Sequence, residues 1–385
     1  MAAAPEAYAG REQAYVKHFL LENYLSDLFH KIAGGFGHIV YVDGFSGPWQ
    51  SAGENYSDTS FGIALKTLSS AKETWKARGK NVIATAFLVE KNQLSFSKLE
   101  GLKESFSDLN LITYNANFID VADTLASQIP RDAFTFLFID PKGWKIEMAM
   151  LKSLFSLRNC EIVFNFMFQF VNRAAYISDP AITKGLNELI TAPNWRQKIL
   201  DASESSTEER KRILVEAFSS TIAQIGGFEY VADTTIFRPM KDQPLYSLIY
   251  ATRKPKGIEV FRNCQIKTLR EQSAVRDATR SADMLRAKGQ HELFGLSEMK
   301  SNTVEIDLQE QARLAKEEFL TIVRQSGNKL SYADIWPKIL SRFVISKPEM
   351  NAIAADARKQ GLITIPNWGV RQRTPHEQSQ IKIGS

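Results

Sequence analysis

The chain contains an acid that stands directly before a glycine-rich turn. Residues 38–42 are apolar and β-branched, and they are followed by Asp43, Gly44, Phe45, Ser46, Gly47 and Pro48. Glycine lets a backbone bend sharply and approach a ligand closely, because it has no Cβ. A loop with a leading acid and few donors for phosphate favours a cationic ligand without phosphate, such as S-adenosylmethionine (SAM). The alternative interpretation is a structural tight turn.

Two further apolar runs end at polar residues that suit a nucleoside. Glu90 and Lys91 follow residues 82–89, and an acid at that position can accept hydrogen bonds from both ribose hydroxyls. After the next run, the amide of Asn117 could read an adenine edge and the ring of Phe118 could stack on it. We interpret these residues as cofactor-binding candidates. The alternatives are surface charges, a turn residue and a core aromatic.

A fourth signal is a turn that joins an acid to a proline and a glycine. The strongly apolar run 134–139 is followed by Asp140, Pro141, Lys142 and Gly143. The carboxylate and carbonyls of such a turn can hold a planar amino group beside a methyl sulfonium, and methyl transfer gains most from alignment. These four residues are therefore catalytic candidates, with an ordinary turn as the alternative.

The elements that must position these residues alternate between strand and helix. The hydrophobic pattern predicts strands at 38–42, 82–89, 110–114, 134–139 and 161–168, and helices at 11–31, 61–68, 93–106, 121–128 and 147–154. Such alternation predicts right-handed βαβ units and a parallel sheet. All four signals then fall at the carboxyl ends of strands on one edge, where open α/β sheets bind ligands. We expect them to line one pocket.

The far edge of the sheet is predicted to carry a hairpin. Residues 228–238 and 245–253 are strand-like and would pair antiparallel. By fold-level analogy, such an end separates methyltransferase folds from plain dinucleotide-binding folds. The absence of a G-x-G-x-x-G fingerprint also speaks against a dehydrogenase. The predicted fold class is α/β, a Rossmann-like class I methyltransferase sheet that is mostly parallel. Alternation is lost between residues 172 and 210, where 201–209 reads as a polar surface insertion.

The last third of the chain predicts a different kind of domain. Residues 265–289 are charged with few apolar anchors, and a further helix follows at 302–325. Capping boxes that begin at Ser331 and Ser346 predict helices at 331–342 and 347–360.

A basic hairpin would follow these helices, built from 362–365 and 369–373. Its Arg371 and Arg373 could track phosphates or be merely solvated. This outline is typical of an α+β winged-helix-like domain, which indicates a nucleic-acid partner. We expect the tail 374–385 to be partly disordered. The predicted domains are 11–262, a helical connector at 263–325, and 326–385.

The composition is that of an ordinary globular protein. The chain has 385 residues, 44% of them hydrophobic, and its net charge of +5 is too mild to identify a polyanion partner. Cys160 and Cys264 lack metal-ligand spacing, so we expect no metal site. No run approaches the ~20 apolar residues that span a bilayer, and the N-terminus has no secretory pattern, so we expect a cytoplasmic location and no membrane partner.

Together, these motifs resemble those of the bacterial three-Cys-motif partner proteins (TcmP). The likeness covers residues 11–260 and rests on Lys17-His18 before an apolar helix and on residues 41–48, 87–90 and 138–143. That family is similar to class I methyltransferases in fold. The resemblance implies a partner protein with a three-cysteine motif, which this chain itself lacks.

The turn at Asp140 is also similar to the Asp-Pro-Phe-Gly turn of tRNA guanine-N methyltransferases. It departs from the Asn/Asp-Pro-Pro-Tyr turn of amino-methyltransferases, because Lys142 stands where an aromatic residue would stack on a flipped base. Trp144 or Phe166 could take that role. Trp49 also stands where many SAM loops carry a further glycine. Lys17 and His18 could touch substrate, although a structural histidine is the alternative for His18.

Two functions of different kinds follow from these observations. The first is a SAM-dependent methyltransferase that acts on a base in RNA or DNA, with Asp140 positioning the nucleophilic nitrogen. The second is a non-catalytic, methyltransferase-shaped adaptor that binds DNA as the partner of a three-cysteine-motif protein. Methyl transfer to a polynucleotide distinguishes the two.

Overall fold

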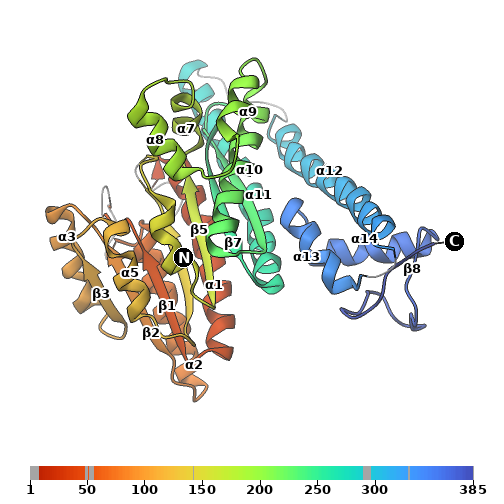
Figure 1. The fold of residues 1–385 in the computed structure, drawn as a ribbon, viewed down its shortest axis with the longest axis horizontal. Coiled ribbons are helices and arrows are strands. Elements are labelled where there is room, and N and C mark those ends of the chain that lie inside the picture. The colour runs from red at the N-terminus through yellow and green to blue at the C-terminus, as the bar shows by residue number, and fades with distance from the viewer. Residues whose placement is uncertain are drawn as a thin grey trace. The chain divides into compact units, whose positions relative to one another are not determined.

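The computed structural model describes residues 8–47, 51, 56–141, 143–288, 296–327 and 330–384. The chain divides into two compact units, Met1–Arg253 and Lys254–Ser385 (Figure 1). The predicted boundary was residue 262. It differs because the helix that begins at Pro255 packs within the second unit.

A seven-stranded sheet forms the centre of the first unit, in the order β3-β2-β1-β4-β5-β7-β6. Its strands are β1 (His38–Asp43), β2 (Ile83–Val89), β3 (Asn110–Tyr114), β4 (Phe134–Ile139), β5 (Cys160–Phe166), β6 (Tyr230–Phe237) and β7 (Pro244–Thr252). The first five pair in parallel, whereas β7 runs antiparallel to both β5 and β6. The mostly parallel α/β sheet with an edge hairpin is therefore confirmed.

Helices cover both faces of this sheet (Figure 1). The described helices of the first unit are α1 (Glu12–Gly35), α2 (Ser60–Ala77), α3 (Gln93–Glu100), α4 (Leu102–Ser105), α5 (Phe118–Gln128), α6 (Lys152–Phe155), α7 (Phe168–Ala174), α8 (Pro180–Leu189), α9 (Trp195–Asp201) and α10 (Thr207–Gly226), with a 3₁₀ helix η3 (Met148–Leu151). The first two pack against each other. On their side of the sheet, Tyr24 of α1 donates to Glu161 of β5 and to Tyr250 of β7.

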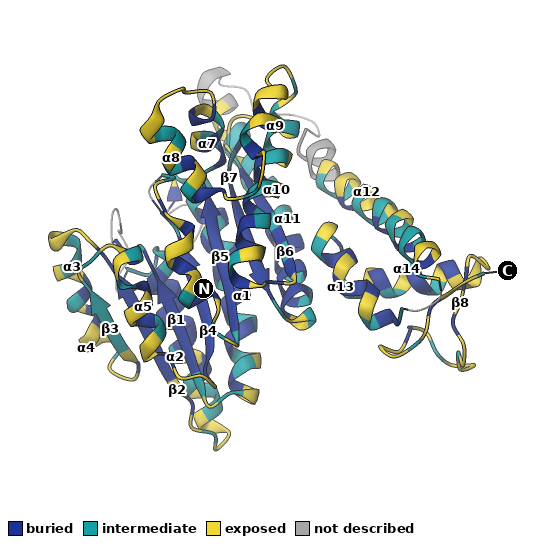
Figure 2. Cartoon of the chain, viewed as in Figure 1, coloured by how far each residue is buried: buried dark blue, intermediate teal, exposed yellow. Residues whose placement is uncertain are grey.

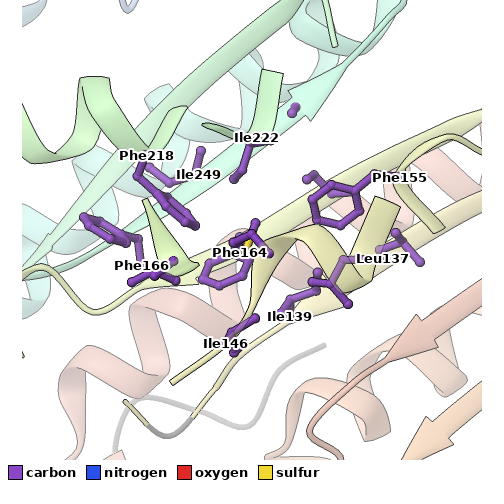
Figure 3. Close-up of a cluster of buried hydrophobic side chains, with 14 of the residues drawn as sticks. Leu137, Ile139, Ile146, Phe155, Phe164, Phe166, Phe218, Ile222 and Ile249 are labelled. Carbon is purple, nitrogen blue, oxygen red and sulfur yellow. The ribbon is translucent and has the colours of Figure 1, made fainter. Parts of the chain in front are cut away.

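The opposite face buries the main hydrophobic cluster (Figure 3). Phe166 of β5 stacks on Phe218 of α10 with ring centroids 4.4 Å apart, and Phe164 meets the same ring edge-on at 4.8 Å. Burial of several aromatic side chains supplies much of the driving force for this packing. Because Phe166 is buried here, the suggestion that it stacks on a flipped base is wrong.

Short helices occupy the stretch where the alternation is lost. Asp179 caps α8, because its Oδ1 accepts hydrogen bonds from the amides of Ala181 and Ile182 at 2.8 and 2.9 Å. The predicted insertion at 201–209 is instead the junction of two helices, where Ser206 is the N-cap of α10. The period was missed because each helix is only a few turns long.

The second unit is mainly helical. It contains α11 (Pro255–Lys288), α12 (Leu296–Gln325), α13 (Tyr332–Arg342), α14 (Lys347–Lys359), β8 (Ile363–Thr364) and β9 (Lys382–Ile383). Both predicted capping boxes are confirmed. The segment predicted as a helical connector, 263–325, forms most of the two long helices of this unit, and its Gln265 and Thr268 are buried. Arg262, which directly precedes it, is 2% exposed and donates to the carbonyls of Leu340 and Ser341 at the end of α13.

The predicted basic hairpin is not formed as expected. β8 pairs with β9, at the end of the chain, and residues 369–373 form an exposed loop (Figure 2). The tail that was expected to be partly disordered supplies β9. Its Ile381 is fully buried, whereas Val370 of the predicted hairpin is fully exposed and gains nothing from pairing there. Arg371 and Arg373 lie in the loop with their side chains exposed.

Across the described part of the chain, no helix has both the length and the apolar character needed to cross a bilayer. Within the same residues, no group of His, Cys, Asp or Glu side chains is arranged to hold a metal ion.

Candidate active site

The loops after four parallel strands are tied together by backbone hydrogen bonds. Gly44 donates to the carbonyl of Phe138 at 3.2 Å, and Ser46 donates to that of Val89 at 2.9 Å. The amide of Glu90 donates to Tyr114 at 3.0 Å. The strand order reverses between β1 and β4, which makes this edge a topological switch point, the usual ligand site of open α/β sheets.

A cavity of about 370 Å³ opens at this edge. Its lining combines acids, bases and apolar groups: Gly44, Phe45, Val89, Glu90, Lys91, Ala116, Asn117, Phe118, Ile119, Asp140, Pro141, Lys145 and Ile146. The volume lies within the range of small-molecule pockets. Residues predicted separately from the ends of β1, β2, β3 and β4 therefore meet in one cavity.

Glu90 contributes a carboxylate that is only partly used by the protein. The residue is 3% exposed, and its Oε1 accepts a hydrogen bond from the amide of Asn92 at 2.6 Å. Asn115 donates to the backbone carbonyl of Glu90 at 2.8 Å, which fixes the main chain at this point. Among the described residues, Oε2 has no hydrogen-bond donor, so it can accept from a ligand in the cavity.

Gly44 allows a close approach, but to an aromatic ring of the protein itself. A Cβ built on Gly44 would lie 2.6 Å from Cδ1 of Phe118. Phe118 is 2% exposed and packs edge-on against Phe45, with centroids 5.8 Å apart. The glycine therefore lets the β1 loop rest on the first residue of α5. Asn117, which precedes it, donates to Asp120 at 2.9 Å and is exposed at the rim.

Asp43 lies beneath the loop and does not line the cavity. It is fully buried, and its carboxylate accepts from the amide of Phe45 at 2.9 Å, Tyr41 at 3.0 Å and Ser60 at 3.1 Å. Burial is the main reason that the pKa of Asp43 rises from 3.8 to about 6, and the charge of Asp140 adds to it while the hydrogen bonds oppose it. Its geometry is that of a residue that shapes the β1 loop.

Asp140, at the end of β4, is held from two sides. Lys17 of α1 pairs with its Oδ2 at 2.6 Å, and Asn165 of β5 donates to its Oδ1 at 2.5 Å. Both oxygens keep further lone pairs, because a carboxylate can accept about four hydrogen bonds. Lys17, predicted as a substrate-binding residue, therefore contacts the site through Asp140 but does not line the cavity.

Several predicted residues lie elsewhere. Trp144 packs on α8, where a Cβ on Gly185 would lie 2.5 Å from its ring. His18 is buried, accepts or donates a hydrogen bond with the hydroxyl of Tyr8 at 3.0 Å, and has a pKa lowered well below 6.5 by that burial. Ser46 is fully buried and donates to the carbonyl of Asp43.

The other predicted residues of the glycine-rich turn and the Asp140 turn either lie next to the cavity in sequence or fall outside the described residues. Gly47 follows Ser46 and donates to the carbonyl of Phe45 at 2.9 Å. Gly143 has a φ of +103°, a conformation that favours glycine. Pro48 and Lys142 lie outside the described residues.

Sequence reasoning missed some of the lining. Lys145 and Ile146 follow the Asp140 turn directly, so their proximity along the chain was the available signal. Asn165 lies beside a run of aromatic residues at the end of β5. It is the polar exception in an otherwise apolar strand end, and its contact with Asp140 gives it a place in the site.

No protein-family model matches the chain, and the comparison with curated proteins found no match. Among solved structures, the chain is similar to protein LPL1258 from Legionella pneumophila, of family DUF519, with 10% identity and a TM-score of 0.34 over 63% of this chain and 88% of that one. It is also similar to the YcgJ protein from Bacillus subtilis, with 11% identity and a TM-score of 0.26 over 60% and 98%. At such TM-scores neither likeness bears on the site or its chemistry.

Proposed function

We propose that this chain is a SAM-dependent methyltransferase that acts on a base in nucleic acid. The observation that carries the proposal is that Glu90 and Asp140, from the ends of β2 and β4, line one cavity. One carboxylate suits a ribose and the other suits the amino group of a second molecule. A site that transfers a group between two bound molecules needs both.

The residues present fit the cofactor. Oε2 of Glu90, which has no donor among the described residues, can accept from a ribose hydroxyl, and Phe118 with Ile119 gives an apolar wall for an adenine ring. SAM would supply an electrophilic methyl group on a sulfonium. Glu90, whose charge no ion pair within the described residues compensates, can face the positive sulfonium, and the sequence carries no glycine-rich phosphate loop.

Asp140 is the residue that would position the acceptor. Lys17 and Asn165 fix its carboxylate in one orientation, so that its remaining lone pairs face a constant direction. Holding a nitrogen in line with a good leaving group accounts for most of the catalysis that such a reaction needs. Lys17 also compensates the charge of Asp140, so we assign to Asp140 a positioning role and not that of a strong base.

Two further features support this assignment. The antiparallel β7 at the end of a parallel sheet is, by fold-level analogy, the mark of methyltransferase folds and not of dinucleotide-binding folds. In the second unit, the capped pair α13 and α14 followed by the β8–β9 ladder is compatible with a winged-helix-like domain, and Arg371 and Arg373 are exposed beside it.

A second candidate function is the non-catalytic adaptor that serves as the partner of a three-cysteine-motif protein. The observation that favours it is that both oxygens of Asp140 already have protein partners. An adaptor of this kind would bind SAM without turnover, or would not bind it. The two candidates therefore differ in a measurable way.

Isothermal titration with SAM and with its demethylated product tests the cofactor site. Glu90→Gln keeps the acceptor for Asn92 but replaces the other oxygen by a donor, so we expect a loss of affinity of about 10-fold or more, as for a lost charge-assisted hydrogen bond. Glu104→Gln, an exposed glutamate on α4, is the matched control and should bind as the natural chain does. Equal affinity for both variants would contradict the assigned cofactor site.

Transfer of a tritiated methyl group from SAM to total tRNA, rRNA and DNA tests the activity. The natural chain should label one of these pools, and Asp140→Asn should lose labelling while it still binds SAM. Tight SAM binding without labelling of any polynucleotide would favour the adaptor.

A further inference from the structure

The surface beside the proposed active site is formed by α7 and the turn between β6 and β7. β6 and β5 both run antiparallel to β7, so the carboxyl end of β6 lies at the same edge of the sheet as the Asp140 turn. Asn165, which donates to Asp140, stands three residues before α7 begins. Both segments therefore border the catalytic edge.

Hydrogen bonds join the helix and the turn into one surface. The guanidinium of Arg238 donates to Oε1 of Gln169 at 2.9 Å, and Nε2 of the same glutamine donates to the carbonyl of Pro244 at 2.6 Å. The amide of Arg238 donates to the carbonyl of Gln243 at 3.0 Å and closes the turn. We call this the α7 surface, and it comprises Phe170, Arg173, Arg238, Met240 and Lys241.

The α7 surface combines exposed apolar groups with positive charge. Phe170 and Met240 are 44% and 45% exposed. The guanidinium of Arg173 lies 5.1 Å from the centroid of the Phe170 ring. Within α7 and the turn 238–243, the sequence places three basic residues, Arg173, Arg238 and Lys241, beside one acid, Asp242.

A second pair of a cation and a ring follows the Asp140 turn along the chain. The ammonium of Lys145 lies 5.9 Å from the Trp144 ring, and Lys145 also lines the cavity. Aromatic rings beside cations bind unstacked bases, while the cations contact the phosphates. Duplex bases are already stacked on one another, so this combination favours a single strand.

We propose that the α7 surface binds single-stranded RNA and leads it to the Asp140 turn. Most single-stranded nucleic acid in a cell is RNA, because DNA is kept as a duplex, and unpaired RNA bases are recognised by stacking on aromatic and guanidinium groups. Phe170 stacks on one base, and Arg173, Arg238 and Lys241 contact the phosphates next to it. The inference rests on the proposed function, since it names the kind of polynucleotide that the same site receives.

Fluorescence anisotropy with a labelled 20-nucleotide single-stranded RNA and the full chain tests this proposal. Phe170→Ala should weaken binding at least about 5-fold, the loss expected for one stacked base, whereas Phe170→Tyr keeps the ring and should bind normally. Arg238→Gln should reduce the salt dependence of log Kd by about 0.7, as for one phosphate contact of a single strand. Arg131→Gln, exposed before β4 at the opposite edge, is the matched control.

Each other outcome overturns a stated part of the proposal. Unchanged binding by Phe170→Ala removes the α7 surface as the site. Equal affinity for single-stranded DNA of the same sequence overturns the choice of RNA, and equal affinity for duplex RNA overturns the choice of a single strand. Phe170 does not line the cofactor cavity, so SAM titration of the same variants separates the two proposals. If the chain binds RNA through Phe170 but does not bind SAM, only the proposed function is contradicted.

Discussion

Lys17 and Asp140 are 123 residues apart in sequence, and their side chains form an ion pair with a nitrogen–oxygen distance of 2.6 Å. The pair links the first helix of the chain to the end of the central strand β4. Both side chains are mostly buried, at 15% and 22% exposed, so solvent screens the pair only partly. The N-terminal helix therefore helps to build the site that the later turns form.

Lys17→Met should destabilise the protein by about 1–3 kcal/mol, because it leaves a partly buried carboxylate with one fewer charged donor. Lys31→Met is a matched control, since Lys31 pairs with Asp27 at 3.7 Å with both side chains about half exposed. That change should cost less than about 0.5 kcal/mol. Urea unfolding followed by circular dichroism measures both. Equal losses would mean that the pair with Asp140 contributes no more than a surface pair.

Asp43 should make stability depend on pH in the mildly acidic range. Its pKa is raised to about 6 in the folded chain, so the folded state binds the proton more tightly than the unfolded state does. Its contribution to stability is therefore fully present below pH ~4 and is lost as the pH rises through 6. The folded-state pKa is about two units above 3.8, and each unit corresponds to ~1.4 kcal/mol, so the loss of stability is at most about 3 kcal/mol.

Asp43→Asn isolates this effect. An amide keeps an acceptor for the amide of Phe45, and the hydroxyls of Tyr41 and Ser60 can rotate to accept from its nitrogen. We expect the stability difference, variant minus natural chain, to rise between pH 4 and pH 7. A difference that stays constant over this range would contradict the raised pKa. Comparing the two chains at each pH cancels the titration of His18 and Glu161.

Gly44→Ala should damage both stability and cofactor affinity. The added methyl group would lie 2.6 Å from the Phe118 ring, and overpacking of this kind costs about 1–3 kcal/mol. Phe118→Val in the same chain should recover part of the loss, because it removes the atoms that clash. Gly35→Ala, at the end of α1 with nothing within 4 Å of the new methyl, is the control and should be neutral or slightly stabilising. Thermal unfolding and SAM titration report the two effects; a double variant no better than Gly44→Ala alone would exclude the clash as the cause.

The parallel half of the fold could be predicted because its signals are local. The runs at 110–114 and 134–139 coincide with β3 and β4 to the residue, since both are apolar strands bounded by polar turns. The carboxyl ends of parallel strands share one edge of the sheet, so Glu90 after β2 and Asp140 after β4 could be placed in one pocket without coordinates.

What the sequence did not predict depends on contacts between distant residues. Nothing near Asp43 in sequence indicates that Ser60 donates to its carboxylate, and no pattern links Asn165 to Asp140. The second unit was misdivided for the same reason, because the charged surface of α11 masks the buried Arg262 that holds α13. Likewise, two-residue strands such as β9 carry no period from which to predict them.

The segment that leads into β9 packs in the second unit, and a substitution of its buried Ile381 tests whether it stabilises that unit. Ile381, just before β9, is fully buried, and the neighbouring Glu377 accepts a hydrogen bond from the indole of Trp336 at 2.7 Å. Ile381→Ala should destabilise the second unit by about 2–5 kcal/mol, as for other buried isoleucines. Val370→Ala, in the exposed loop of the predicted hairpin, should change stability by less than about 0.5 kcal/mol, because Val370 is fully exposed. Hydrogen exchange in α13 and α14 measures the local loss. If α13 and α14 are as well protected from exchange in the Ile381→Ala variant as in the natural chain, the tail is dispensable for the second unit and β9 does not stabilise it.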